Sequence, residues 1–457
     1  MKKILAYTAF LISLLWLCPG FISAQDVNPV KDADRFFPDF QADADMRAAT
    51  PDRDYKNSGI QYGGWLTPVM IDQRNSDTSL TSSLTTAKVW AKSYIWDNNY
   101  VYVRLKDSFL WIAGQEGYSL DDTDNVFDLD VAFISMSFAG QSLRLSAGRK
   151  FYLLGSGLLF NGRGDGLEFQ YVSSLASVKL FGAYTGLLAK DSNPYGLSDK
   201  DISDGAKRLF AGGTIERGIN NQTLYLLGLA QVDNGDEDSG QKSRYQSQYF
   251  GLGIKGVAFK EMFYYAEAVY ETGVSYLSGT SEESDIRAGA AIVGVDYYLD
   301  MALNPALIFQ YAYGSGDSGR SDYRATGNTS GNDTGFISFG TFVGGYALNP
   351  VLANLHIARA GFSFTPMSWS ERLYLKRMTL IMKYTLYLKD KKDSAINNQE
   401  AVLNERLVGH GADLALRWKI FYDLSAFVNY AVFIPGEAYD SSENNRHFTM
   451  LGLNLSF

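Results

Sequence analysis

The sequence predicts an all-β protein: a transmembrane antiparallel β-barrel of about 18 strands, with short periplasmic turns and long extracellular loops. Three observations support this prediction. Segments in which apolar and polar residues alternate with a period of two follow one another along most of the chain. The gaps between these segments alternate between long and short. Beyond residue 24 there is no apolar run long enough for a transmembrane helix, so a membrane-embedded chain of this kind must be a barrel.

The amino-terminal end is typical of a secretory signal peptide. Lys2 and Lys3 precede an apolar run that ends near Leu17, and the small residue Ala24 offers a cleavage point. We therefore expect a signal segment at residues 1–24 that is removed on export.

The rest of the chain divides into a periplasmic lead-in at 25–57 and the barrel at 58–457. The only cysteine, Cys18, lies inside the signal segment, so the mature chain would contain no disulfide. A lipoprotein signal would carry a small residue just before this cysteine, whereas the chain has Leu17 there.

The strands are predicted from alternation and from the turn residues between them. Residues 40–47 also alternate and are an alternative first strand. The predicted strands are 58–72, 82–96, 100–111, 127–138, 142–151, 165–173, 176–186, 207–217, 221–233, 246–257, 260–275, 284–299, 302–314, 353–366, 372–389, 405–417, 420–433 and 445–457.

The lengths of the gaps favour a barrel over a β-sandwich. A barrel with both termini in the periplasm has long loops outside and tight turns inside, whereas a sandwich has no such rhythm. The short turns include 97–99, 139–141 and 218–220. The long gaps are 112–126, 187–206, 234–245, 315–352, 390–404 and 434–444.

The last strand shows the alternation most clearly. One row is apolar enough for lipid and ends on an aromatic residue, while the other row is small and polar. Such a strand resembles the signal that is read by the outer-membrane assembly machinery, although the edge strand of a sandwich could end in the same way. The apolar row is Leu451, Leu453, Leu455 and Phe457.

Composition agrees with a barrel and excludes one class of partner. The chain has 44 glycines, 30 tyrosines and 28 phenylalanines, which suit turns, strands and aromatic girdles. Its formal net charge is −9, and removal of Lys2 and Lys3 with the signal segment makes it −11. An acidic chain is not expected to bind nucleic acid.

Strand parity sorts the charged residues into those that face lipid and those that face the lumen. Where Val101, Val103 and Leu105 face lipid, the residues between them face inward. The predicted basic lumen residues are Lys88, Lys92, Arg104, Lys106, Arg144, Lys179, Lys255, Arg359, Arg377, Lys383 and Arg417. The predicted acidic lumen residues are Asp128, Asp130, Glu168, Glu216, Glu267, Glu271, Asp296, Asp413 and Asp423.

Several motifs, most of them in the carboxy-terminal third, resemble the alginate export family of outer-membrane channels. They are Gly148-Arg149-Lys150, Phe160-Asn161-Gly162, Gly345-Tyr346-Ala347-Leu348-Asn349-Pro350, Asn354-Leu355-His356, Gly361-Phe362-Ser363-Phe364, Gly409-His410-Gly411-Ala412-Asp413-Leu414 and Val432-Phe433-Ile434-Pro435-Gly436-Glu437-Ala438. The resemblance implies a monomeric barrel of about 18 strands that passes polysaccharide or other solutes.

The predicted lumen charges depart from what export of a polyuronate requires. A polyanion that leaves water needs a net positive path, whereas the basic and acidic lumen residues nearly balance. A neutral or mixed-charge solute is therefore at least as good a candidate as alginate. Alternatively, opposed Arg and Asp residues pair across the lumen and only brace the wall.

The longest gap, 315–352, has two halves of different character. Residues 314–335 are rich in Gly, Ser, Asp and Asn, whereas residues 336–342 are apolar and aromatic. The apolar half either folds into the lumen as a constriction or lid, or extends the strand at 353–366 above the membrane.

Other motifs carry less weight. The acidic tips at 121–125 and 233–238 could offer oxygen ligands to calcium, but they are interpreted as solvated loops because they lack the EF-hand spacing. Residues 161–166, which contain an Arg-Gly-Asp tripeptide, are interpreted as a glycine-rich turn.

The sequence gives little support to catalysis. His356 and His410 fall on lipid-facing rows and His447 lies at the outer end of the last strand, and no serine-hydrolase or zinc-protease motif occurs.

We therefore interpret the chain as an integral outer-membrane channel for a hydrophilic solute, with no enzymatic activity and no cofactor or metal. Its expected partners are membrane lipid, the solute and the assembly machinery. An alternative function is that of a surface adhesin or receptor that acts through its loops.

Deletion of residues 318–335 tests the lid hypothesis. If the apolar half of the loop folds into the lumen, the deletion should loosen it and raise single-channel conductance in a planar bilayer. An unchanged conductance would contradict the hypothesis.

Overall fold

We describe the protein from a computed structural model, which covers residues 59–75, 78–187, 196–198, 201, 205–235, 242–259, 261–325, 327–397 and 400–457. The predicted signal segment, the lead-in, Cys18 and the alternative first strand at 40–47 lie outside these residues.

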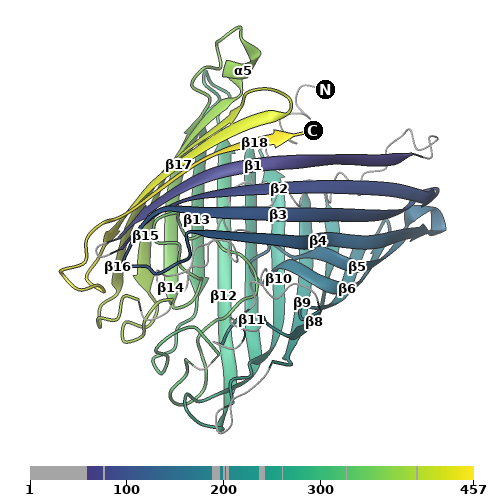
Figure 1. The fold of residues 1–457 in the computed structure, drawn as a ribbon. Helices are drawn as coiled ribbons and strands as arrows, with labels where there is room; N and C mark the ends of the chain where they lie inside the picture. The colour runs from purple at the N-terminus through teal and green to yellow at the C-terminus, as the bar shows by residue number, and fades with distance from the viewer. Residues whose placement is uncertain are drawn as a thin grey trace.

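The described residues form a single closed sheet of eighteen antiparallel strands, in which each strand pairs with its neighbours in sequence and β1 also pairs with β18 (Figure 1). The strands are β1 Ile60–Arg74, β2 Ser79–Trp96, β3 Asn99–Glu116, β4 Thr123–Phe138, β5 Leu143–Leu154, β6 Phe160–Val172, β7 Ser177–Tyr184, β8 Arg208–Ile219, β9 Gln222–Asp233, β10 Gln246–Ala258, β11 Met262–Tyr276, β12 Glu283–Tyr298, β13 Ala306–Gly314, β14 Leu355–Phe364, β15 Met378–Lys389, β16 Leu407–Lys419, β17 Leu424–Pro435 and β18 Arg446–Ser456.

Alternation in the sequence becomes alternation of exposure in the wall. Along β3 the buried residues include Tyr102, Arg104 and Lys106, while Val101 and Val103 between them are exposed. The exposed row is apolar and the buried row is polar or aromatic, which is the reverse of a soluble sheet and the pattern of a wall between lipid and lumen. No helix in the described part of the chain is long and apolar enough to cross a membrane.

The predicted strands match the observed ones one to one, which confirms the predicted barrel. The prediction of a turn at 161–166 was wrong, because these residues lie within β6. Glycines suggested a turn, but here they allow close packing: a Cβ at Gly164 would come within 2.9 Å of the Ala183 side chain on β7. A short helix, α5 Leu373–Lys376, also replaces the start of the strand predicted at 372–389.

The last residue of the chain helps to close the barrel. The backbone N–H of Gly64 donates to the Phe457 carbonyl at 2.9 Å, and the Phe457 N–H donates back to Gly64 at 3.0 Å. A Cβ at Gly64 would lie 2.7 Å from the Phe457 ring, so the glycine makes room for the terminal aromatic side chain. The place of β18 beside β1 therefore depends on a close contact at the chain end (Figure 1).

The backbone pairing of the wall is interrupted over a long stretch between β4 and β5. β4 and β5 pair only from Phe138 opposite Leu143 to Ala132 opposite Arg149. Beyond that point β4 continues beside β3, and β5 continues beside β6, without pairing with each other. The far half of the β5–β6 hairpin is thus released from β4.

The contact at Gly64 predicts a selective effect of adding one methyl group. Gly64→Ala should destabilise the refolded barrel by about 1–3 kcal/mol, because the Cβ overlaps Phe457 and the Lys88 carbonyl. Urea unfolding in micelles, followed by the mobility shift of the folded barrel on gels, would measure this. Gly218→Ala is the matched control, since a Cβ there meets nothing within 4 Å; equal stabilities would contradict the prediction.

Candidate functional site: the lumen and the segments that fill it

The structure places nearly all of the predicted lumen residues within strands. The exceptions are Arg377, which lies between α5 and β15, and Asp423, which lies in the turn before β17; both are exposed. Strand parity does not apply to these two residues, because the strands begin later than predicted. Among the others, exposure differs widely: Arg104 and Asp130 are fully buried, whereas Lys255 is exposed.

Charged residues of several strands form a buried network where β4 parts from β5. Arg104 on β3 donates to Asp130 at 2.5 Å, and neither side chain is exposed. Arg163 on β6 donates to Asp130 at 2.5 Å and to Asp128 at 3.0 Å. Arg149 on β5 lies 3.5 Å from Asp128. The network therefore links four strands across the gap in backbone pairing.

Arg149 also hydrogen-bonds to the backbone of β4 beyond the point where β4 and β5 stop pairing. Its guanidinium donates to the Leu129 carbonyl on β4 at 3.2 Å and makes two hydrogen bonds of 2.9 Å to Asp165 on β6. A bidentate Arg–carboxylate pair is rigid as well as strong. Sequence analysis missed these residues, because parity would turn Arg149 toward lipid and because Arg163 and Asp165 lay in the predicted turn at 161–166. Their burial in one ionic cluster could not be seen without the departure of the hairpin from β4.

A second group of cations lies on the wall formed by β14, β15 and β16. Arg359 donates to Gln310 at 2.9 Å and to the Val343 carbonyl at 2.7 Å. Arg417 donates to Asn429 at 2.7 Å and to the Tyr346 hydroxyl at 3.1 Å. Each guanidinium is therefore held by neutral acceptors.

No carboxylate in the described part of the chain comes within 4.0 Å of these two arginines or of Lys383, which lies opposite Asp413 in the register. Arg359 and Arg417 on this wall are therefore not bound by a carboxylate at salt-bridge distance.

The apolar half of the 315–352 gap packs inside the barrel. Phe339 pairs with Phe160 at the start of β6, and its N–H donates to the Leu159 carbonyl at 3.0 Å. Its ring also meets Phe210 of β8 and Tyr249 of β10. Contacts with strands this far apart in a closed barrel must be made through the lumen. Residues 336–342 therefore fold inward and do not extend β14, which begins at Leu355.

The tip of the β5–β6 hairpin meets the same segment. Thr341 donates through its N–H to the Gly157 carbonyl at 3.0 Å, and Leu158, Leu159 and Phe160 belong to one hydrophobic cluster with Phe336, Ile337 and Phe339. We call these two segments, residues 155–160 and 336–342, the lumen insert. Within the barrel, the insert joins the tip of the β5–β6 hairpin to the long loop before β14.

The polar half of the long gap is fixed by a buried ion pair. Arg320 donates to Asp333 through Nε at 2.7 Å and through Nη2 at 2.5 Å. Burial alone would lower the pKa of Arg320, but the Asp333 carboxylate raises that pKa above its usual value, so the arginine stays charged. Asp333 also accepts from Ser275 on β11 at 2.9 Å, which ties the loop to the wall.

All three histidines of the chain lie on strands near the ends that join the long loops, each beside a tyrosine. His356 and His410 share hydrogen bonds of 2.7 Å with the exposed Tyr311 and Tyr384. His447 shares one of 3.2 Å with Tyr430. Tyrosines exposed on a barrel wall are typical of an aromatic girdle. Among the described residues no cluster of His, Cys, Asp or Glu could hold a metal ion.

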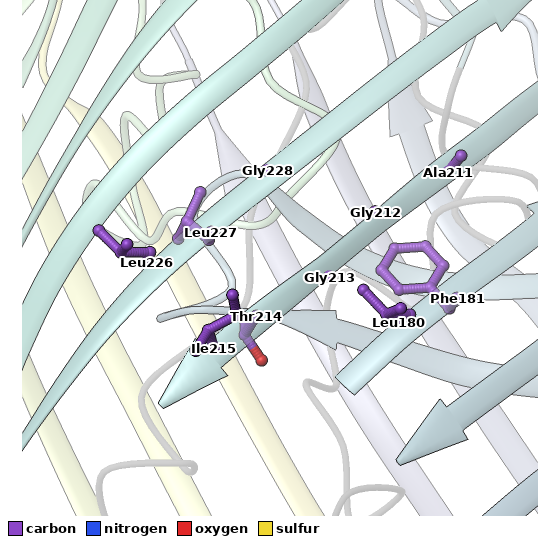
Figure 2. A pocket seen from close by; sticks show the side chains of 10 residues that line it. All are labelled: Leu180, Phe181, Ala211, Gly212, Gly213, Thr214, Ile215, Leu226, Leu227 and Gly228. Atoms are coloured by element: carbon purple, nitrogen blue, oxygen red, sulfur yellow. The ribbon is translucent and has the colours of Figure 1, made fainter. Parts of the chain in front are cut away.

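A hollow of 470 Å³ lies in the wall at β7, β8 and β9 (Figure 2). It is lined by apolar side chains such as Leu180 and Leu226 and by the bare backbone of Gly212, Gly213 and Gly228. No charged residue lines it, so it lacks the groups that would bind a hydrophilic solute.

Comparison with known proteins agrees with this architecture. Residues 71–450 match the family model described as alginate export. Similar solved structures include Acinetobacter baumannii OccAB1 (10% identity, TM-score 0.57, covering 89% of this chain and 99% of that chain) and Pseudomonas aeruginosa OccK11 (12% identity, TM-score 0.52, 87% and 96%). Another is Pseudomonas aeruginosa OccK2 in complex with glucuronate (10% identity, TM-score 0.53, 87% and 96%). At these identities the likeness shows the fold. A search of curated protein sequences found no match.

The buried network predicts a large cost for removing one of its carboxylates. Asp130→Ala should lower the free energy of unfolding by about 3–5 kcal/mol, because it leaves the buried Arg104 without its counter-charge. The control is Asp285→Ala, whose partner Arg287 is mostly exposed, and its effect should stay below about 1 kcal/mol. Urea titration of both variants in micelles would measure the difference, and equal losses would contradict the assignment.

Proposed function

Because the chain belongs to the alginate export family of outer-membrane β-barrels, we propose that it is a channel through which a small hydrophilic solute diffuses. The observation that carries this proposal is the lumen insert, which packs inside the barrel and is hydrogen-bonded to β6, β10 and β11 of the wall. An insert of this kind narrows the path.

A narrowed path favours a solute of a few sugar units or less over a polysaccharide strand. An extended polymer needs a continuous opening along the whole barrel at every moment, whereas a small solute needs only a gap beside the insert. The open width of an eighteen-stranded barrel alone would admit either. We therefore assign the size limit to the insert and not to the wall.

The distribution of charge supports a weak preference for anions. Asp128 and Asp130 are paired with arginines, so they contribute little net negative field to the path. Arg359, Lys383 and Arg417 are not paired in this way, and they lie on neighbouring strands of one wall. A carboxylate or a polarised hydroxyl of the solute would find hydrogen-bond donors there.

The remaining parts of the proposal follow from the closed wall. The barrel completes its own hydrogen bonding through β1 and β18, so we propose that it works as a monomer in the lipid of the outer membrane. We also propose that the row ending in Phe457 is the segment read by the assembly machinery. Passage of a solute by diffusion needs no catalytic group and no cofactor.

Single-channel recording of the purified barrel under a salt gradient tests the function. We expect small conductance steps and a reversal potential that shows weak anion preference, with neutral sugars permeating liposomes less well as their length increases. Arg417→Gln should shift the reversal potential toward cations, because it removes a lumen charge.

Arg377→Gln is the matched control, since Arg377 is exposed between α5 and β15. Strong block by alginate oligosaccharides with free passage of long chains would replace the small-solute proposal by polysaccharide export. A correctly folded barrel without any conductance would favour the adhesin or receptor function.

A further inference from the structure

Two glutamates on β11 hold the lumen insert in the same way. Glu267 accepts hydrogen bonds from the Ser156 N–H at 2.7 Å and the Ser156 hydroxyl at 2.8 Å. Glu271 accepts the Ile337 N–H at 3.0 Å. The first glutamate thus binds the tip of the β5–β6 hairpin, and the second binds the inward-folded part of the long loop.

Each glutamate is also fixed by tyrosine hydroxyls from the wall. Tyr225 on β9 donates to Glu267 at 2.7 Å. Tyr245 and Tyr249 donate to Glu271 at 2.5 Å and 2.9 Å. Both residues are buried: Glu267 is 3% exposed and Glu271 is 0% exposed. A buried carboxylate that receives several hydrogen bonds has its orientation determined, so it can serve as an anchor.

The spacing of the two anchors matches the construction of the insert. Glu267 and Glu271 are four residues apart on one strand, so both side chains lie on the same face of β11, one above the other. The two segments that they hold are joined to each other by the hydrogen bonds of Phe339 and Thr341. The insert is therefore attached to β11 at two successive levels.

The backbone at the hairpin tip is adapted to this attachment. Gly155 has φ +58°, and a Cβ built there would overlap the Glu267 carboxylate and the Leu227 side chain. Only a glycine allows the tip to approach the carboxylate this closely. The hairpin is also unpaired with β4 over its far half, so few backbone hydrogen bonds of the wall oppose a movement of the tip.

From this geometry we infer that Glu267 and Glu271 are positioning residues that set the open width of the channel by anchoring the lumen insert to β11. They act through the insert and need not touch the solute. The inference rests on the proposed channel function. It assigns to these two acids a role distinct from charge selection, which would require them to face the path.

A pair of glycine substitutions tests the anchor without removing any charge. Gly155→Ala should push the tip away from Glu267 and raise single-channel conductance several-fold. Gly279→Ala is the control, because Gly279, in the turn between β11 and β12, also has a positive φ, of +72°, and so shares the backbone strain. A Cβ there would meet nothing within 4 Å. We expect the control to conduct as the unmodified barrel does.

Glu271→Gln and Glu267→Gln extend the test to the anchors themselves. A glutamine keeps one acceptor oxygen, so conductance should rise less in these variants than in Glu271→Ala and Glu267→Ala. The reversal potential should change less than the conductance. If Glu267 and Glu271 only stabilised the fold, their substitution would lower the folded fraction on gels, and the barrels that do fold would conduct equally in the glutamine and alanine variants.

A thiol reporter gives a readout that does not require the channel to conduct. Leu158→Cys places a thiol in the insert, where the native side chain is 2% exposed. The mature chain is expected to have no other cysteine. A polar thiol reagent should modify this cysteine slowly in the otherwise unmodified barrel and much faster when Gly155→Ala is added, but not when Gly279→Ala is added.

The outcomes separate the two proposals. Equal conductance and equal labelling for the Gly155 and Gly279 variants would overturn the anchor, while the channel function would stand. Folded barrels that never conduct, yet whose labelling responds to Gly155→Ala, would support the anchor and overturn the channel function. Conductance and labelling that both rise with Gly155→Ala would support both.

Discussion

The constraint on which this structure depends is that every backbone N–H and C=O in the membrane wall needs a partner. In hydrocarbon an unsatisfied group costs several kcal/mol, so the sheet must close on itself. The mutual hydrogen bonds of Gly64 and Phe457 show how far this reaches, since even the last residue of the chain takes part in the closure. Where β5 leaves β4, side chains must supply the hydrogen bonds that the neighbouring backbone would otherwise make. Arg149 does so by donating to the Leu129 carbonyl.

That interruption explains why so many charges are buried in one place. A hairpin that turns away from the wall exposes an edge of β4, and edges are normally covered or charged. Here Asp128 and Asp130 lie along that edge and bind arginines from both β3 and β6. A buried ion pair contributes little net stability compared with an apolar contact, but its geometry is specific. We interpret the network as a joint that fixes the point at which the hairpin departs.

The barrel could be predicted from the sequence because alternation is local. Lipid on one side and water on the other impose the same two-residue period on every strand, and each strand carries that information alone. The lumen could not be predicted to the same depth. Parity correctly separates Val101 from Tyr102, but it says nothing about Arg163, whose direction depends on a hairpin that has left the wall. The glycines of residues 161–166 indicated a turn because their packing depends on the tertiary structure: Gly164 and Gly166 lie close to β7, which local sequence cannot show.

The same limit applies to counting lumen charges. The nearly equal numbers of basic and acidic residues suggest a neutral path. The hydrogen-bond partners of the acids, however, differ from those of the bases. Asp128 and Asp130 neutralise arginines, and Glu267 and Glu271 receive hydroxyl and amide donors from the insert and the wall. Arg359 and Arg417 bind neutral oxygens and so retain their field. The electrostatics of the path therefore follow from which partners the fold assigns to each charge, and the weak anion preference that we propose rests on these partners and not on the number of carboxylates.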